Sequence, residues 1–185
     1  GIPNKNEYLN DGDIVNIDVT TIIDGYYGDT SRMYLIGNVS DRAKELVDTT
    51  YESMMRAISI CRPGLKLSEV GKTIQNMCEP KGFSIVRDFC GHGTGKVFHD
   101  APNVLHYYDT ENERIILQEG MVFTIEPMVN TGTYELYVED NDWTARTQDG
   151  GLSAQFEHTI GITKNGVEIF TKSPAGFTKP PYNKK

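Results

Sequence analysis

Residues 13–37 read DIVNIDVTTIIDGYYGDTSRMYLIG, and this stretch decides the fold. Over positions 14–20, β-branched apolar residues alternate with polar ones, which is the period of a β-strand. Asp24-Gly25 is a strong signal for a two-residue hairpin turn. We therefore expect a second strand over about 26–36, antiparallel to the first.

Two helices and several short strands are predicted downstream. Ser40 is a suitable N-cap for a first helix that ends before Pro63-Gly64, and a second, shorter helix runs from about Ser68 to Cys78. β-Branched and aromatic runs predict strands over 83–86, 120–129, 134–140, 142–148, 152–163 and 167–170, with the last pair joined at Asn165-Gly166. The predicted class is α+β, an antiparallel sheet with helices packed on one face. We expect one domain over 1–171, followed by a loose, Pro- and Lys-rich tail over 172–185.

The composition excludes some classes of protein. A net charge of −8 argues against a nucleic-acid binder, which usually carries a basic excess, but it is compatible with carboxylates gathered for cations. The three cysteines form no C-x-x-C pair and predict free thiols in a reducing compartment. No apolar run approaches the roughly 18 residues of a membrane span, and no signal peptide opens the chain. We expect a cytoplasmic protein without a membrane partner.

Four acids lie inside apolar strand segments: Asp18, Asp29, Glu126 and Glu157. Burying a carboxylate costs several kcal/mol unless it is paired or binds a metal. Turn-flanking aspartates or salt bridges could explain one or two, but we find no Lys or Arg in these strand cores to match all four. The hairpin turn places position 18 near position 31, so Asp18 and Asp29 should lie close. We expect a β-bulge at Gly28 to bring both to one face.

CGHGTGKVFH, residues 90–99, offers either a phosphate-binding loop or a metal ligand. The phosphate-loop pattern fails, because Lys96 stands where the second glycine is required and Val97 follows that lysine. His92 instead supplies a nitrogen ligand, and the glycines allow close backbone approach. One imidazole and four carboxylates can hold two divalent cations whose charge they balance. Such hard, oxygen-rich sets suit Mn²⁺, Fe²⁺, Co²⁺ or Zn²⁺.

The order of these motifs resembles that of a known family. NIDVT, GDTSRMY, GHGTGKVFH, MVFTIEPM and SAQFEHT look like the successive motifs of type I methionine aminopeptidases, over nearly the whole chain except the tail. The resemblance implies the pita-bread fold with a dinuclear metal centre. It also implies metal-dependent removal of the initiator methionine from nascent proteins, by a hydroxide that bridges the metals and attacks the first peptide bond. Two divalent ions are implied, with Co, Mn, Fe, Zn and Ni as candidates.

The resemblance assigns metal ligands by position. Asp18 resembles the chelating ligand of one metal, and Asp29 and Glu157 resemble the bridging carboxylates. His92 and Glu126 resemble the ligands of the other metal.

The resemblance also assigns the substrate-binding and catalytic residues. His99 matches the histidine that contacts the substrate carbonyl, and Glu126 matches the proton shuttle. Phe98 and Trp143 match the apolar wall that receives the methionine side chain, with ordinary core packing as the alternative. His106 and His158 receive no role from the family.

Three alternatives stay open. Gly1-Ile2-Pro3 matches the end of a family motif whose histidine precedes the glycine, so the resemblance implies a catalytic body that lacks its N-terminal portion. A fragment of this kind could bind metal without turnover. The second alternative is an X-Pro peptidase of the same fold, and the third is a non-catalytic scaffold that binds peptides. The expected partners are N-terminal methionyl peptides, with ribosome association as a candidate and a monomer as the expected state.

Overall fold

The first hairpin forms as predicted. The structure is a computed structural model that describes residues 1–2 and 4–182; the predicted motif residue Pro3 and the tail residues 183–185 lie outside this description. β1 (Ile14–Ile23) and β2 (Tyr26–Leu35) pair antiparallel. Asp24 and Gly25 between them have φ values of 52° and 81°, the left-handed conformation that a two-residue hairpin turn requires.

The expected bulge at Gly28 is wrong. The β1–β2 register is unbroken, with Asp18 opposite Ser31, as predicted, and Thr20 opposite Asp29. Directly opposed residues share one face of an antiparallel pair, and so do residues two apart in one strand. Asp18 and Asp29 are therefore diagonal neighbours on one face without any bulge.

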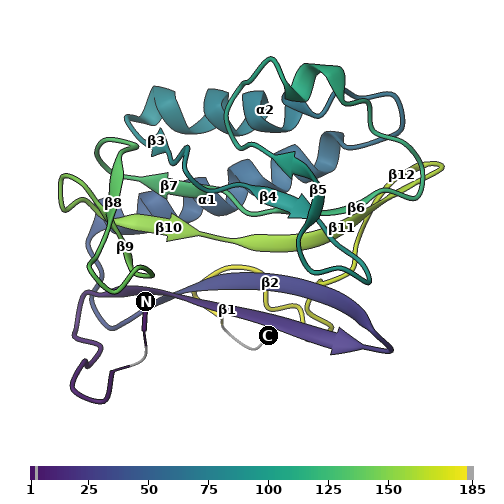
Figure 1. The fold of residues 1–185 in the computed structure, drawn as a ribbon. Coiled ribbons are helices and arrows are strands. Elements are labelled where there is room, and N and C mark those ends of the chain that lie inside the picture. The colour runs from purple at the N-terminus through teal and green to yellow at the C-terminus, as the bar shows by residue number, and fades with distance from the viewer. Residues whose placement is uncertain (3, 183–185) are drawn as a thin grey trace.

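A seven-stranded antiparallel sheet carries most of the fold (Figure 1). Its order is β1-β2-β11-β6-β4-β5, with β12 also paired to β11. Its remaining strands are β4 (Gly91–Gly93), β5 (Asp100–Val104), β6 (Val122–Ile125), β11 (Glu157–Thr163) and β12 (Gly166–Ile169). β11, late in the chain, thus lies between the first hairpin and β6. The β11–β12 hairpin is confirmed, with its loop at Lys164-Asn165, one residue earlier than predicted.

Two of the predicted strands are each broken beside an acid. The 120–129 segment splits into β6 and β7 (Met128–Asn130), and the 152–163 segment splits into β10 (Ser153–Gln155) and β11. The three strands β7, β10 and β3 (Ser84–Ile85) form a second small sheet. Pro127 has no N–H to donate to a neighbouring strand, so the strand does not continue past Glu126. Glu126 and Glu157 therefore stand where the chain passes from one sheet to the other.

The helices cover one side of the sheets. α1 (Asp41–Ile60) and α2 (Ser68–Cys78) pack against each other: in Figure 1, α2 lies at the top and α1 lies below it, behind the strands, with the β1–β2 hairpin at the bottom of the molecule. The Ser40 side chain accepts a hydrogen bond from the Ala43 N–H, as expected of an N-cap. Short 3-10 turns span Glu79–Lys81 and Asn112–Arg114. Within the described residues, neither helix is long and apolar enough to cross a membrane.

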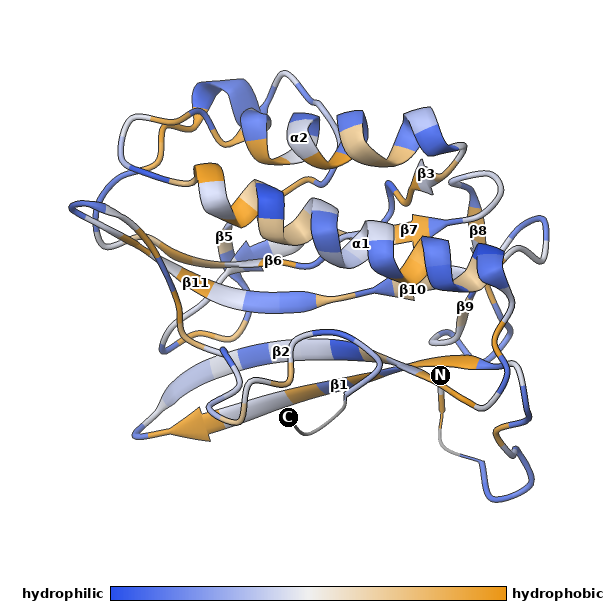
Figure 2. Cartoon of the chain, turned by 180° about the vertical axis from the view of Figure 1, so that it is seen from behind, coloured by the Kyte–Doolittle hydropathy of each residue, from blue (hydrophilic) through white to orange (hydrophobic). Residues whose placement is uncertain are grey.

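A smaller hairpin and the free edge of the large sheet complete the fold. β8 (Leu136–Val138) and β9 (Ala145–Thr147) pair with each other alone. β1 has a partner on one side only within the described chain, and its apolar end is orange in Figure 2. The apolar neighbours Ile17 and Val19 favour a buried strand around Asp18, but this expectation is wrong, because Ile17 is 50% exposed and Val19 48%.

The segment predicted as a tail contacts the body over its described part. Lys179 Nζ lies 2.8 Å from Asp48 Oδ1 on α1. The Tyr182 hydroxyl donates to the Met33 carbonyl on β2 over 2.7 Å. The division of the chain at 171/172 stays a prediction.

Candidate metal centre

Three buried side chains from three strands converge. Asp29 of β2, His92 of β4 and Glu157 of β11 each offer a ligand atom, and these atoms all lie within 4.8 Å of one another. Glu126 joins them from the end of β6, with its Oε1 3.7 Å from His92 Nε2. Asp29 Oδ2 lies 3.8 Å from the same nitrogen. The structure therefore brings together four of the five residues predicted to bind metal.

The backbone fixes the orientation and tautomer of His92. A register shift between His92 and Gly93 interrupts the β4–β5 pairing, and such irregularities re-aim side chains. His92 Nδ1 lies 3.0 Å from the Gly93 carbonyl oxygen, which can only accept. Nδ1 therefore donates to that carbonyl, and Nε2 is the ring atom that faces the carboxylates, the orientation that a metal-binding histidine needs.

The glycines beside His92 allow strands to approach closely. A Cβ on Gly91 would lie 2.4 Å from the Thr124 carbonyl oxygen, and one on Gly93 would lie 2.1 Å from that of Ala101. Close approach was the predicted role of these glycines, and the structure shows that the close neighbours are adjacent strands. β4 is thus held tightly between β5 and β6.

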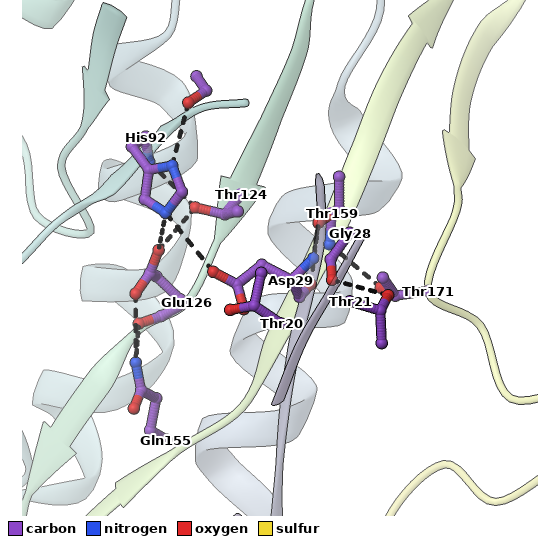
Figure 3. Close-up of polar contacts among 11 residues, drawn as sticks. Thr20, Thr21, Gly28, Asp29, His92, Thr124, Glu126, Gln155, Thr159 and Thr171 are labelled. Atoms are coloured by element: carbon purple, nitrogen blue, oxygen red, sulfur yellow. Dashed lines mark hydrogen bonds and ion pairs between the residues drawn. The ribbon is translucent and has the colours of Figure 1, made fainter. Parts of the chain in front are cut away.

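The Glu126 carboxylate is held at both oxygens (Figure 3). The Thr124 hydroxyl donates to Oε1 over 2.6 Å and itself accepts the His92 backbone N–H. The Gln155 side-chain amide donates to Oε2 over 3.3 Å. These contacts couple the positions of Glu126 and His92 through one threonine.

Asp29 is held in a similar way (Figure 3). The Thr20 hydroxyl donates to Asp29 Oδ1 over 2.8 Å, leaving Oδ2 toward His92. The Asp29 backbone N–H and carbonyl both bond the Thr159 hydroxyl, each over 2.9 Å. The side chain is therefore ordered by β1 and β11 before any ligand binds.

The electrostatics of this cluster suit a cation. Burial, followed by repulsion from the neighbouring acids, raises the pKa of Glu157, and burial also raises that of Glu126. Glu157 Oε1 is buried and has no hydrogen-bond partner. Among the described residues, none of the four carboxylates pairs with a Lys or Arg; Arg32 in β2 faces away, opposite Ile17. Divalent cations would satisfy the orphan oxygen and offset the repulsion.

Asp18, the fifth predicted ligand, stands at the margin of the cluster. Its side chain is exposed, whereas the other three acids and His92 are buried or partly buried. Partial burial and repulsion from Asp29 nonetheless raise its pKa, so its carboxylate is near the site. A metal bound there would have solvent on one side.

The predicted substrate residues are only partly brought together. The His99 ring centroid lies 4.4 Å from that of His92, and Phe98 stacks on Tyr27 at 5.1 Å. Trp143 lies between β8 and β9, is 71% exposed and makes no aromatic contact with Phe98 among the described pairs. The pocket-wall role of Trp143 stays a prediction.

The sequence missed several residues that support the cluster. Thr124 and Gln155 stand two positions before Glu126 and Glu157, a period-two spacing that could have indicated side chains on one face. His158, left without a role, bonds the Thr171 hydroxyl through Nδ1. His106 is buried, burial lowers its pKa to about 3, and its Nε2 accepts the Glu126 N–H. Nothing in the local sequence indicates that contact.

Comparison with known proteins gives the class of this fold and site. The model of metallopeptidase family M24 matches residues 1–164, and the chain belongs to that family. Within it, the similarity is to methionine aminopeptidases: that of Rickettsia prowazekii is 53% identical over 98% of this chain and 70% of its own length. That of Escherichia coli K12 is 50% identical, over 92% of this chain and 64% of its own.

A solved structure supports the same placement. Methionine aminopeptidase from Thermotoga maritima superimposes with a TM-score of 0.90 at 42% identity, covering 94% of this chain and 69% of that one. The pita-bread fold that the motifs predict is therefore confirmed. This chain spans about two thirds of the length of these relatives.

Proposed function

We propose that this chain is the catalytic body of a methionine aminopeptidase, with residues 1–171 as its catalytic unit, that removes N-terminal methionine from peptides. The observation that carries this proposal is the convergence of Asp29, His92 and Glu157 within 4.8 Å. The identity to curated methionine aminopeptidases supports the substrate class.

The proposed ligands are Asp18, Asp29, His92, Glu126 and Glu157, and two divalent ions are the proposed cofactors. When bound, the ions would supply an activated water and a Lewis acid for the peptide carbonyl. Asp29 and Glu157 are proposed to hold both ions. They stand on the neighbouring strands β2 and β11, where Glu157 pairs with Ser31, two residues from Asp29. Co, Mn, Fe, Zn and Ni remain the candidates.

The other residues act on protons and on the substrate. Glu126 is proposed to take a proton from the attacking water and pass it to the leaving amine, as a carboxylate beside the reacting atoms can. His99 is exposed beside His92 and is proposed to donate to the carbonyl oxygen. Phe98, stacked on Tyr27, is proposed to line the methionine pocket. Trp143 is proposed to close this pocket from the β8–β9 hairpin.

The test is hydrolysis of Met-Gly-Met and Met-Ala by the purified chain with each metal in turn, alongside an X-Pro peptide. Release of methionine by the wild type, and not by Glu157→Ala, is the expected result. Cleavage of the X-Pro peptide alone would identify the alternative peptidase. Full activity of Glu157→Ala would refute the proposed site, and metal binding without turnover would identify an inactive fragment.

We further propose a monomer that acts in the cytoplasm on chains emerging from the ribosome. Three free cysteines support a reducing compartment. Sedimentation of the protein alone, and co-pelleting with ribosomes at low and high salt, test these points separately.

A further inference from the structure

Glu126 stands where the ladder of β6 ends. Ile125 still pairs with His158 of β11, but Glu126 lies beyond the strand, and Pro127 follows it. The Glu126 N–H donates instead to Nε2 of His106, over 3.0 Å. The His106 side chain is only 2% exposed. A buried imidazole thus replaces the strand partner at the residue that carries a proposed ligand.

His106 is itself fixed from outside the cluster. The Tyr108 N–H donates to the Gln75 side chain of α2 over 2.9 Å. A Cβ on Gly71 of α2 would lie 2.1 Å from the Tyr107 carbonyl oxygen, so the helix rests directly on this segment. The backbone that follows His106 is therefore held by α2.

We propose that His106 is a positioning residue for Glu126. Its Nε2 accepts the Glu126 N–H, which requires the proton on Nδ1, and this bond sets the backbone at the end of β6. The Glu126 carboxylate then stays on the Thr124 hydroxyl and within 3.7 Å of His92 Nε2. Among the described hydrogen bonds, His106 meets the main chain of Glu126 and not its carboxylate, so it acts through the main chain. The inference rests on the proposed metal centre.

Removing the acceptor leaves a buried N–H without a partner and loosens one ligand. His106→Leu should therefore weaken one of two metal-binding steps by about 10- to 100-fold, the range for lost outer-shell contacts, and leave the other step unchanged. His106→Gln places an amide oxygen near the position of Nε2 and should restore most of the affinity. His106→Asn is too short to do so and should resemble His106→Leu.

The experiment is calorimetric titration of the 185-residue chain with CoCl₂, together with the visible absorption of bound Co²⁺. Ile74→Ala is the matched control, because Ile74 is fully buried in α2 and lies outside the cluster. Thermal melts of every variant confirm that it is folded at the titration temperature. The Co²⁺ spectrum reports ligand geometry, which a general loss of stability does not change.

The expected order of affinity for the weakened step is wild type, His106→Gln, then His106→Asn and His106→Leu, with Ile74→Ala equal to wild type. Equal affinity in His106→Leu and wild type overturns the inference. So does a loss in Ile74→Ala that matches the His106 variants. If His106→Leu does not fold, the Gln and Asn pair decides, and equal affinity in these two overturns the inference. A wild type that binds no Co²⁺ refutes the metal centre itself, which is a separate result.

Discussion

The metal cluster has two sides that are built differently: an interior bank on β4, β6 and β11, and a hairpin bank on β1 and β2. On the bank formed by β4, β6 and β11, the Thr124 hydroxyl and the Gln155 amide hold His92 and Glu126, and Glu157 is placed by the pairing of its strand with Ser31. On the opposite bank, Asp18 lies exposed on an edge strand. The comparison suggests that the interior bank is organised before metal binds, whereas the hairpin bank has less packing to hold its outer ligand.

The largest effect is expected on the interior bank. Glu157→Gln removes a buried charge and a proposed bridging ligand, and should lower metal affinity and activity by at least about 100-fold, more than outer-shell changes cost. Without metal, the same variant should melt higher than wild type at pH 8. Burial raises the pKa of Glu157, so the wild type must either bury a charge or take up a proton when it folds, and the amide does neither. Metal content by mass spectrometry and thermal melts check both effects. A metal-free variant that melts lower than wild type would contradict the electrostatic argument.

Removing the metal should make the stability of the fold depend on pH, because the buried acids then repel one another without a cation between them. A carboxylic acid with a raised pKa contributes its full stabilisation of the fold at pH values below the ordinary pKa of the group. This stabilisation is lost as the pH rises through the raised pKa. The pKa of Glu126 rises from 4.5 to about 7 through burial. Glu126 alone should therefore cost the chelated chain about 2 kcal/mol, or roughly 5 °C in Tm, between pH 5 and pH 8, and the raised pKa of Glu157 adds to this loss. The metal-loaded chain should lose much less, and parallel pH profiles would contradict this expectation.

A smaller effect is expected on the hairpin bank, where Asp18 is exposed. Asp18→Asn should weaken one metal-binding step by about 10-fold, at the low end for altered metal sites, and change the metal-free Tm by less than about 2 °C. Solvent already shares this position, so little desolvation is relieved. Calorimetric titration beside Glu157→Gln measures the contrast. Equal losses in the two variants would abolish the distinction between the banks.

The smallest effect is expected away from both banks. Trp143 is 71% exposed, and Trp143→Ala should leave stability within about 0.5 kcal/mol of wild type. If Trp143 closes the methionine pocket, the variant should raise KM with little change in kcat. Phe98→Ala, which removes a stacked ring beside His99, should raise KM more. A larger rise in KM for Trp143→Ala than for Phe98→Ala would place the pocket wall on the β8–β9 hairpin instead.

The local elements could be predicted because their signals are local. Asp24-Gly25 fixes the first hairpin, and Ser40 fixes the start of α1. The break at Glu126 had a cue in Pro127, but its consequence, a change of sheet, depends on partners far along the chain. The exposure of Asp18 depends on what lies beside β1, which the alternation of residues cannot report.

The ligands could be predicted because acids in apolar strands are costly and therefore conspicuous. Their supports were not predicted, since threonine and glutamine in strands are ordinary. The contact between His106 and Glu126 joins residues twenty positions apart through a ring and a backbone amide. No periodic pattern encodes such a contact.

The position of β11 has a consequence for how this protein comes into being. Glu157 pairs with Ser31 and His158 with Ile125, so one late segment joins the first hairpin to the middle of the sheet. Contacts so distant along the chain form slowly, and they cannot form before the late segment has been synthesised. A growing copy of this chain would carry Asp18, Asp29, His92 and Glu126 for much of its synthesis without a closed site. The proposed metal site would therefore stay incomplete until β11 has been synthesised and inserted between β2 and β6.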